Sequence, residues 1–430
     1  MYRFTHGLHV STEHGRPSTK EWGLRPSEAM SSARPLEGLT VLELGQLLAG
    51  PFCGFMLAGF GARVIKVEPP GTGDAIRSWR VLDDDGTSLW WRSLARDKYS
   101  VTADLRQEAG QEIIRDLVRS GVDVVIENFR PGRMEAWGLG PEALHAIDPR
   151  VVMVRISGYG QDGPYASRPG FANIAEAFAG FRHLTAEPGR PPVRGGVSLG
   201  DTNAGLHAAY ATLAAIYERD VGGSGKGQVI DVALYESMFN MMESLLPEYD
   251  RKGVIRQPTG GALPGIVPSN TYACSDGRIV IGANSERLFT ALMRLVDRDD
   301  LAKDPELATN DGRSARATEL DDAIDAWTSQ RTCADALEGL RQAEVPSGPI
   351  NTIADIAADP HVQAREMMPE LPLPSGDMLK VPAVVPKLSR TPAGSRWLGP
   401  ELGQHNAEVY GDRLGYTAQK LKALKASNTI

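Results

Sequence analysis

The sequence predicts an α/β protein in which a large domain with a parallel sheet is joined to a smaller α+β domain. From residue 39 onwards, short runs of β-branched residues alternate with helical patterns, as in a parallel sheet covered on both faces. After residue 270, a hairpin pattern and three helical patterns follow instead, which indicates a second unit. A chain of 430 residues, 42% of them hydrophobic, is long enough for more than one core. The large domain is therefore expected to be Rossmann-like.

The expected elements of the large domain alternate along the chain. In order they are a strand at 39–45, a glycine-rich helix at 51–61, a strand at 62–68, a helix near 110–120, a strand at 122–128, a short helix at 141–147 and a strand at 150–158. A long helix follows Asp201, and residues 229–249 form a strand that runs into a helix. The long helix has four large apolar residues on one face: Leu206, Tyr210, Leu213 and Tyr217. Because such sheets bind ligands at the carboxyl ends of their strands, we expect the site there.

Shifts in composition set the expected domain boundaries. A hairpin with an Asp-Gly turn at 271–284 precedes the predicted helices at 286–296, 318–330 and 333–343. The expected division is an irregular N-terminal extension at 1–34, a large α/β domain at 35–240 and about 385–430, a linker at 241–257, a small α+β domain at 258–350 and a return linker at 351–384. In the extension, Met30 is an alternative start to Met1. The nearby His6, His9 and His14 lack a carboxylate or thiol at fixed spacing, which favours incidental histidines over a metal site.

Charge and cysteine usage exclude several classes of protein. A net charge of −8 and a pI of 5.6, without a run of Lys or Arg, argue against nucleic acid as a partner. No apolar run approaches the roughly 20 residues that a membrane span requires. The three cysteines are far apart in the sequence and form no CxxC pair, so neither a disulfide framework nor a structural metal is expected. These features favour a cytoplasmic protein.

The segment GVSLGDTNAG places one carboxylate, Asp201, directly before the predicted long helix. Asp is a preferred N-cap residue because its side-chain oxygen accepts a hydrogen bond from an unpaired helix N–H. The segment by itself therefore favours a cap, and a nucleophilic carboxylate is the alternative.

A dinucleotide-dependent oxidoreductase is another alternative, because Glu68 ends a predicted strand where an acidic residue can bind a ribose. The preceding turn reads GQLLAGPFCG, however, and not GxGxxG. Leu47, Leu48 and Pro51 would obstruct the close approach of a pyrophosphate to the backbone. NAD is therefore not expected as a cofactor.

Nine segments occur in collinear order from about residue 35 to about residue 411, nearly the whole chain beyond the extension. They are LEGLTVLELGQLLAGPFCG, GARVIKVEPPGTGD, DVVIENFRPG, SGYGQDGPY, RPGFANIAEAFAG, GVSLGDTNAG, GKGQVIDVALYESMF, VPSGPI and ADPHVQAREM. In this order the chain resembles the class III coenzyme A transferases, the family of formyl-CoA, carnitine-CoA and dicarboxylate-CoA transferases. The substrates implied are a CoA thioester and a small carboxylic acid.

The resemblance implies that Asp201 is the nucleophile. Such a carboxylate attacks the thioester to give a mixed anhydride, and the released CoA thiolate then forms an aspartyl-CoA thioester. The acceptor acid reverses these two steps. A helix N-terminus suits this role because the local dipole keeps the carboxylate ionised, so capping and attack are compatible.

The resemblance also implies where CoA binds. The residues expected to contact it are Gln46, Leu48, Asp104, Arg106, Asn128, Phe129, Arg130 and Arg133. The first two fall near the thioester, the next two at the nucleotide end, and the last two are candidates for phosphate. Gly260 and Gly261 resemble a glycine loop that covers the nucleophile and could donate N–H groups to the anhydride oxygens. A flexible linker is the alternative for that loop.

The related α-methylacyl-CoA racemases remain an alternative of the same fold. Their chemistry needs a histidine as a second acid/base where this chain has Phe171, and phenylalanine cannot transfer a proton. The resemblance therefore favours a transferase.

The segments RPGFANIAEAFAG and VALYESMF resemble members that use succinyl-CoA with small dicarboxylic acids. A second carboxylate on the substrate would need a cation, for which the candidates are Arg77, Arg80, Arg182 and Arg194. The resemblance also implies a homodimer of interlocked chains.

Overall fold

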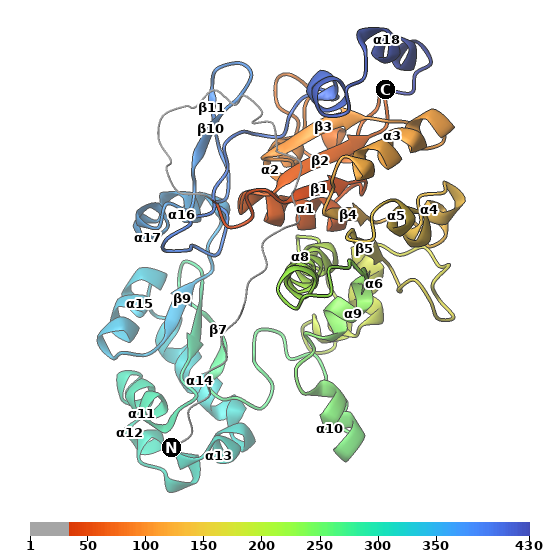
Figure 1. The fold of residues 1–430 in the computed structure, drawn as a ribbon. Coiled ribbons are helices and arrows are strands. Elements are labelled where there is room, and N and C mark those ends of the chain that lie inside the picture. Colours follow the sequence, from red (N-terminus) through yellow and green to blue (C-terminus); the bar gives the residue numbers. More distant parts are fainter. Residues whose placement is uncertain (1–33) are drawn as a thin grey trace, which may run out of the picture. The chain divides into compact units, whose positions relative to one another are not determined.

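The computed structural model describes residues 34–430, in which the largest sheet has six strands (Figure 1). They are β1 (Thr40–Glu43), β2 (Arg63–Glu68), β3 (Lys98–Thr102), β4 (Val124–Glu127), β5 (Val152–Ser157) and β6 (Val229–Ala233). All neighbours pair in parallel, in the order β3-β2-β1-β4-β5-β6. This is a doubly wound order, in which the direction of winding changes between β1 and β4. The expected α/β fold class is confirmed.

The sequence pattern does not predict β3, because three of its five buried side chains, Lys98, Ser100 and Thr102, are polar. Strand side chains alternate between the two faces of a sheet. Tyr99 and Val101 join an apolar core, but Lys98 and Ser100 are buried among polar groups on the opposite face. A strand that buries lysine and serine lacks the apolar run that marks the other strands.

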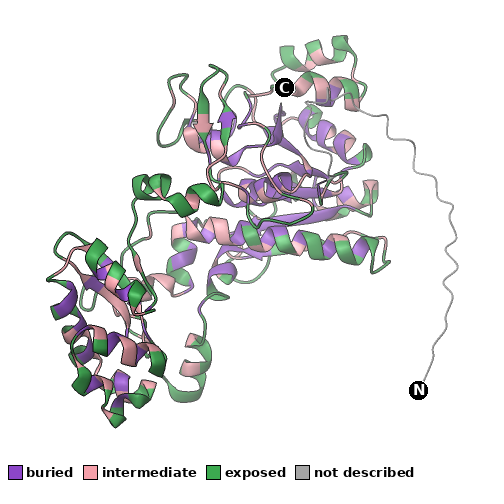
Figure 2. Ribbon diagram, turned by 90° about the vertical axis from the view of Figure 1, so that its left-hand side faces the viewer, coloured by how far each residue is buried: buried purple, intermediate pink, exposed green. Residues whose placement is uncertain are grey.

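Helices cover both faces of the large sheet. The main ones are α1 (Ala49–Gly59), α3 (Glu108–Arg119), α5 (Pro141–Ile147) and α8 (Leu199–Asp220). Leu42 packs into a core with α3, α5 and the C-terminal helical turn Ala407–Arg413, whereas Val41 packs into a core with α1 and α8. Strands β1 to β5 are buried almost throughout (Figure 2). Residues near the C-terminus thus belong to the same core as the first strands.

Helix α8 buries a face of small residues. The four large apolar residues expected to share one face are exposed by 42–66%: Leu206, Tyr210, Leu213 and Tyr217. The opposite face packs against α1 so closely that a Cβ on Gly205 would lie 2.7 Å from the Ala49 carbonyl oxygen. Only small side chains fit between helices at this separation. The large apolar face of α8 is therefore not buried within residues 34–430.

Residues 267–345 form a core of their own. Its antiparallel sheet contains β7 (Ser269–Ala273), β8 (Arg278–Gly282) and β9 (Ser347–Pro349). Its helices are α11 (Glu286–Leu295), α12 (Asp299–Ala302), α13 (Asn310–Ala315), α14 (Ala317–Thr328) and α15 (Cys333–Gln342). The hairpin β7-β8 and helices α11, α14 and α15 correspond to expected elements. Cys274 and Cys333, which are distant in sequence, are neighbours here as free thiols.

The segments expected to be linkers contain short regular elements. The predicted helix up to residue 249 is split into α9 (Leu234–Phe239) and α10 (Leu245–Lys252), because Glu243 adopts a φ of +49°, which a helix does not tolerate. The return segment and the C-terminus contain α16 (Ile353–Ala358), α17 (Pro360–Ala364), β10 (Glu370–Pro372), β11 (Met378–Lys380) and α18 (Ala418–Ala426). The domain boundaries stay a prediction.

Within residues 34–430, no helix has both the length and the apolar character needed to cross a membrane. The expectations for His6, His9, His14 and Met30 concern residues outside the described part of the chain.

Candidate active site

The turn between β1 and α1 lies at the carboxyl end of the large sheet and is held by two side chains. Asn128 bonds both backbone groups of Gln46: its Oδ1 accepts from the N–H and its Nδ2 donates to the carbonyl, each at 2.8 Å. Leu47 has a φ of +65°, which is a strained conformation for a bulky residue. Its N–H donates to Asp74 Oδ1 at 3.0 Å. Asn128 and Asp74 thus fix the backbone of this turn.

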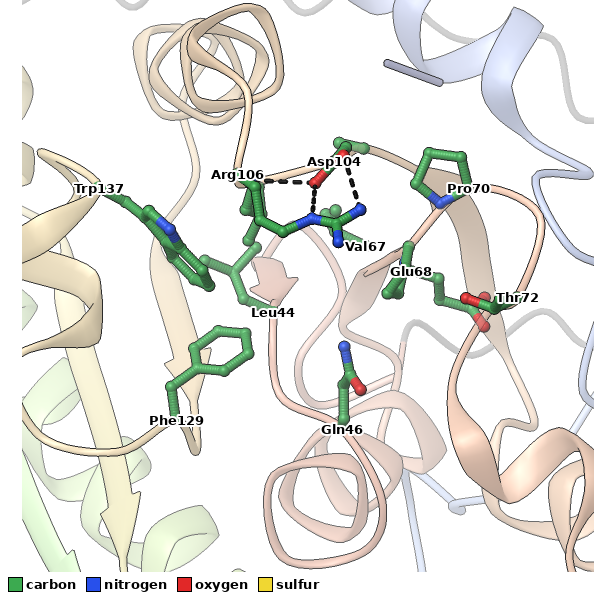
Figure 3. Close-up of a pocket in the computed structure, with 13 residues that line it drawn as sticks. Leu44, Gln46, Val67, Glu68, Pro70, Thr72, Asp104, Arg106, Phe129 and Trp137 are labelled. Atoms are coloured by element: carbon green, nitrogen blue, oxygen red, sulfur yellow. Dashed lines mark hydrogen bonds and ion pairs between the residues drawn. The ribbon is translucent and has the colours of Figure 1, made fainter. Parts of the chain in front are cut away.

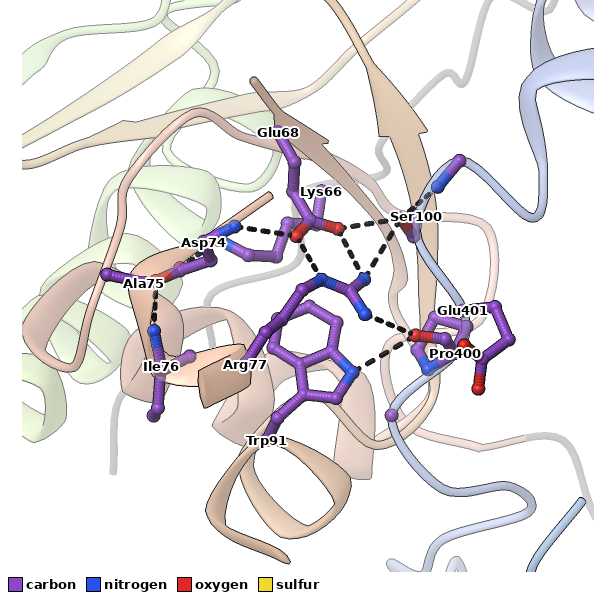
Figure 4. A network of polar contacts seen from close by, with 12 residues as sticks. Lys66, Glu68, Asp74, Ala75, Ile76, Arg77, Trp91, Ser100, Pro400 and Glu401 are labelled. Atoms are coloured by element: carbon purple, nitrogen blue, oxygen red, sulfur yellow. Dashed lines mark hydrogen bonds and ion pairs between the residues drawn. The ribbon is translucent and has the colours of Figure 1, made fainter. Parts of the chain in front are cut away.

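Buried charges beneath this turn form a network (Figure 4). The Lys66 ammonium lies 2.9 Å from Asp74 Oδ2 and 3.1 Å from Glu43 Oε1. It also donates to the Gly45 carbonyl at 2.7 Å, and Lys98 lies 2.8 Å from Glu43 Oε2. Burial lowers the pKa of Lys66, but the two carboxylates outweigh burial and raise it. Lys66 therefore remains charged and supports the turn from below.

Glu68 and Arg77 extend this network towards the C-terminal segment. Arg77 Nε lies 2.7 Å from Glu68 Oε2, and its guanidinium lies 3.7 Å from the ring centroid of Trp91 and donates to the Pro400 carbonyl (Figure 4). Glu68 also accepts a hydrogen bond from the Ser100 hydroxyl at 2.6 Å. Arg77 thus has its binding partners within the chain. Glu68, the residue considered above for binding a ribose, likewise has its carboxylate in contact with Arg77 and Ser100.

A pocket of about 420 Å³ opens beside this turn (Figure 3). Four residues expected at the CoA site line it: Gln46, Asp104, Arg106 and Phe129. Arg106 binds both oxygens of Asp104, at 2.8 and 2.9 Å, and hydrogen bonds from Arg106 lower the pKa of Asp104 to about 2. Trp137 packs edge-to-face on Phe129, with 5.1 Å between ring centroids. The pocket therefore combines an aromatic wall with an ion pair.

A smaller pocket of about 190 Å³ adjoins the first, because Phe129 lines both. The other expected site residues in it are Leu48, Asn128, Arg130 and Asp201. In its wall, a Cβ on Gly158 would lie only 2.9 Å from the Gly170 Cα. The contact requires glycine at both positions, 158 and 170. It places the segment that leads into Phe171 next to the end of β5.

Asp201 is the third residue of α8, and the N-cap is Ser198. The interpretation of Asp201 as the cap is therefore wrong. Among residues 34–430, no group donates a hydrogen bond to its carboxylate. Burial and, to a smaller extent, the neighbouring Glu176 carboxylate raise the pKa of Asp201 to about 6, against the opposing effect of Arg194. The helix dipole does not outweigh burial, but at pH 7 most of the carboxylate is still ionised.

Glu176 is a site residue that the sequence analysis misses. It lies on α6 (Ala172–Phe178) and is buried. Its Oε1 accepts from the Gly200 N–H at 3.3 Å, in the first turn of α8. Its Oε2 lies 3.7 Å from Arg182 Nη2 and 3.8 Å from Arg194 Nε. No motif spacing marks this residue, and the one available signal is a charge among the small and apolar residues of ANIAEAF.

Three expected site residues line neither pocket: Arg133, Gly260 and Gly261. Arg133 is exposed at the start of α4 (Arg133–Ala136). The Gly260 N–H donates to the Ala186 carbonyl at 3.0 Å, so in this structure it is not available to an anhydride oxygen. The proposed role of this loop stays a prediction.

The fold and the site together define a doubly wound α/β protein with a carboxylate, Asp201, in a pocket at the carboxyl edge of its sheet. A sequence model of CoA-transferase family III matches residues 36–406. The protein belongs to this family and is an enzyme that transfers CoA, which confirms the resemblance seen in the sequence.

Individual relatives agree with this assignment. The chain is 47% identical to the succinyl-CoA–D-citramalate CoA-transferase of Chloroflexus aurantiacus, over 92% of this chain and 98% of that protein. It is 37% identical to the beta subunit of the succinyl-CoA–L-malate CoA-transferase of the same organism, over 94% of this chain and 100% of that subunit. The crystal structure of a CaiB/BaiF family protein from Brucella suis matches with a TM-score of 0.78 at 36% identity, over 88% of this chain and 99% of that one.

Proposed function

We propose that this enzyme transfers CoA from succinyl-CoA to a small dicarboxylic acid, with Asp201 as the nucleophile. The observation that carries the proposal is the Asp201 carboxylate, which lies in a pocket without a hydrogen-bond donor from residues 34–430. Its lone pairs are therefore available for attack on a carbonyl carbon. The names of the citramalate and malate enzymes support the class of substrates.

The reaction proceeds through four exchanges at one carboxyl group. The Asp201 carboxylate attacks the thioester carbonyl of succinyl-CoA, and the C–S bond breaks to give a succinyl-aspartyl anhydride and CoA thiolate. The thiolate attacks the aspartyl carbonyl, so that succinate leaves and an aspartyl-CoA thioester remains. The acceptor carboxylate attacks this thioester and releases the thiolate, which then attacks the acyl carbonyl of the acceptor. Asp201 is regenerated, and the energy of the thioester is kept.

In this proposal CoA extends across both pockets. The thioester lies beside Asp201, the pantetheine arm passes Phe129, and the nucleotide occupies the larger pocket. The aromatic wall of that pocket suits an adenine ring. Arg106 in the larger pocket and Arg130 in the smaller one offer cations to the phosphates.

Phe171 argues against the racemase alternative. It lines the same pocket as Asp201, where a racemase would need a second group able to exchange a proton with the α-carbon. A phenyl ring has no such proton. A racemase would incorporate deuterium from heavy water at the α-carbon and would move no CoA between acids.

The test is to incubate the enzyme with succinyl-CoA and a panel of carboxylic acids and to identify each CoA product by mass. We expect new thioesters of dicarboxylic acids from the wild type and none from Asp201→Ala, which should still bind CoA. Hydroxylamine added during turnover should modify the peptide that contains Asp201, because an activated ester forms there. An unmodified peptide, or turnover by Asp201→Ala, would refute the mechanism.

We also propose a homodimer in the cytoplasm. Support for the dimer comes from α8, where Leu206, Tyr210, Leu213 and Tyr217 form an exposed apolar stripe that is typical of a surface covered by a partner. The three cysteines are free thiols, which suits a reducing compartment.

A further inference from the structure

Two arginines that face Glu176, the charged neighbour of Asp201, have few partners. Arg182 belongs to α7 (Phe181–Leu184), and Arg194 lies in the loop before α8. Both face the same oxygen of Glu176 at 3.7 and 3.8 Å, which is beyond a direct hydrogen bond. Within residues 34–430, the buried Nε of Arg182 has no hydrogen-bond partner. An unsatisfied buried donor is costly and indicates that a ligand completes the site.

The other candidate cations are engaged elsewhere. Arg77 is held in its ion pair and against an indole ring, as described above. Arg80 lies 3.9 Å from the ring centroid of Trp90. Arg168 lines the pocket of Asp201, but its guanidinium lies 3.6 Å from the ring centroid of Tyr165. Arg130 also lines this pocket and is assigned above to the phosphates of CoA. Arg168 is therefore the competitor that an experiment has to separate from Arg182 and Arg194.

We propose that Arg182 and Arg194 bind the distal carboxylate of the dicarboxylic substrate while its other carboxyl group reacts at Asp201. The inference rests on the function proposed above. Glu176 is the positioning residue: one of its oxygens faces both guanidinium groups, and the other accepts from Gly200 at the start of α8. A substrate carboxylate would take up the unused donors in charge-assisted hydrogen bonds.

One pair of arginines is sufficient for both halves of the reaction. Succinate leaves before the acceptor enters, so the two acids occupy the same place in turn. Each carries a second carboxylate at the far end of a short chain. In the proposed anhydride and thioester intermediates Asp201 carries no charge, so the two cations then face the single anion of Glu176 and the cluster retains positive charge for that carboxylate. The site thus selects dicarboxylic acids as a class.

The test compares a dicarboxylic with a monocarboxylic substrate pair. The variants Arg182→Gln and Arg194→Gln are assayed with succinyl-CoA and malate, and with butyryl-CoA and propionate. Loss of a charge-assisted pair should lower kcat/KM for the dicarboxylic pair at least about tenfold. Single-turnover formation of the enzyme–CoA thioester from butyryl-CoA should change by less than about twofold, because butyrate has no distal charge. Arg194→Lys should recover part of the loss.

Matched variants make the result decisive. Arg190→Gln removes an exposed arginine of the same loop and should leave both pairs unchanged. Equal losses with both pairs would show a structural role for the arginines and overturn the inference. A selective loss in Arg168→Gln, with Arg182→Gln and Arg194→Gln unaffected, would also overturn it. If the wild type moves no CoA from either thioester, the proposed function falls first, and this inference falls with it.

Discussion

The reactivity of Asp201 depends on the charges around a single carboxyl group. Burial and the Glu176 carboxylate raise its pKa to about 6, so the unreactive protonated form becomes important just below neutral pH. We expect kcat/KM for succinyl-CoA to fall on the acid side with a midpoint near this value, measured from about pH 5 to about pH 8. Glu176→Gln removes the negative neighbour and should shift that midpoint to lower pH. The exposed Glu187→Gln serves as the control, and an unmoved midpoint in Glu176→Gln would contradict the coupling.

The same pKa predicts an effect of Asp201 on stability. The folded state binds this proton more tightly than the unfolded chain, whose pKa is 3.8. The resulting stabilisation is complete below 3.8 and is lost as the pH rises through about 6. Asp201→Asn carries no charge, so at pH 7 we expect it to be more stable than the wild type by at most roughly 3 kcal/mol. Urea unfolding should show about half of that gain near pH 5. An Asp201→Asn variant that is less stable than the wild type at pH 7 would contradict this, and would indicate that the folded protein donates a hydrogen bond to the Asp201 carboxylate.

Some of these residues could be predicted from the sequence, and others depend on contacts that only the fold creates. Asp201 and Phe129 belong to motifs, and the structure brings them into the same pocket. Glu176 belongs to no motif, because its role arises from the contact between α6 and the start of α8. Asn128 belongs to a motif too, but its hydrogen bonds to the Gln46 backbone are visible only in the fold, and its contact with CoA stays a prediction.

At the scale of the element, the contact between α1 and α8 decides which residues α8 can tolerate. Alanine normally stabilises a helix by about 1 kcal/mol over glycine. At position 205, however, the added Cβ would lie 2.7 Å from the Ala49 carbonyl and 3.1 Å from Phe52 Cβ. We expect Gly205→Ala to destabilise the protein by about 1–3 kcal/mol in denaturant unfolding. At the exposed position 214, Ala214→Gly should cost about 1 kcal/mol from helix propensity alone. A stabilised Gly205→Ala would show that the helices can separate.

The elements themselves were predicted where apolar residues alone determine them. The runs at β1, β2, β4 and β5 are rich in β-branched residues, and each forms the expected strand, although β2 also buries Lys66 and β5 buries Arg155. Strand β3 was missed because Lys98 faces Glu43 within the sheet region, where an ion pair replaces apolar packing. Apolar patterns in a sequence predict buried strands well, but they do not show which charged residues are buried in ion pairs.

At the scale of the whole molecule, amphipathic periodicity identifies the apolar face of α8 but does not say what covers it. The helix is placed by its small residues, which fit against α1. Its large apolar residues are exposed within residues 34–430. The homodimer proposed above would cover them.

The exposed stripe on α8 therefore predicts how the subunits associate. Tyr210 and Leu213 lie in the middle of the stripe and are exposed by 60% and 42%. If a second copy covers them, a buried unpaired charge at either position would be strongly unfavourable. We expect Tyr210→Asp and Leu213→Asp to convert a dimer into monomers in analytical ultracentrifugation, with unchanged circular dichroism. Lys303→Glu, which changes an exposed charge far along the chain, should remain dimeric. A wild type that sediments as a monomer, or aspartate variants that stay dimeric, would assign this stripe to something other than a second copy of the chain.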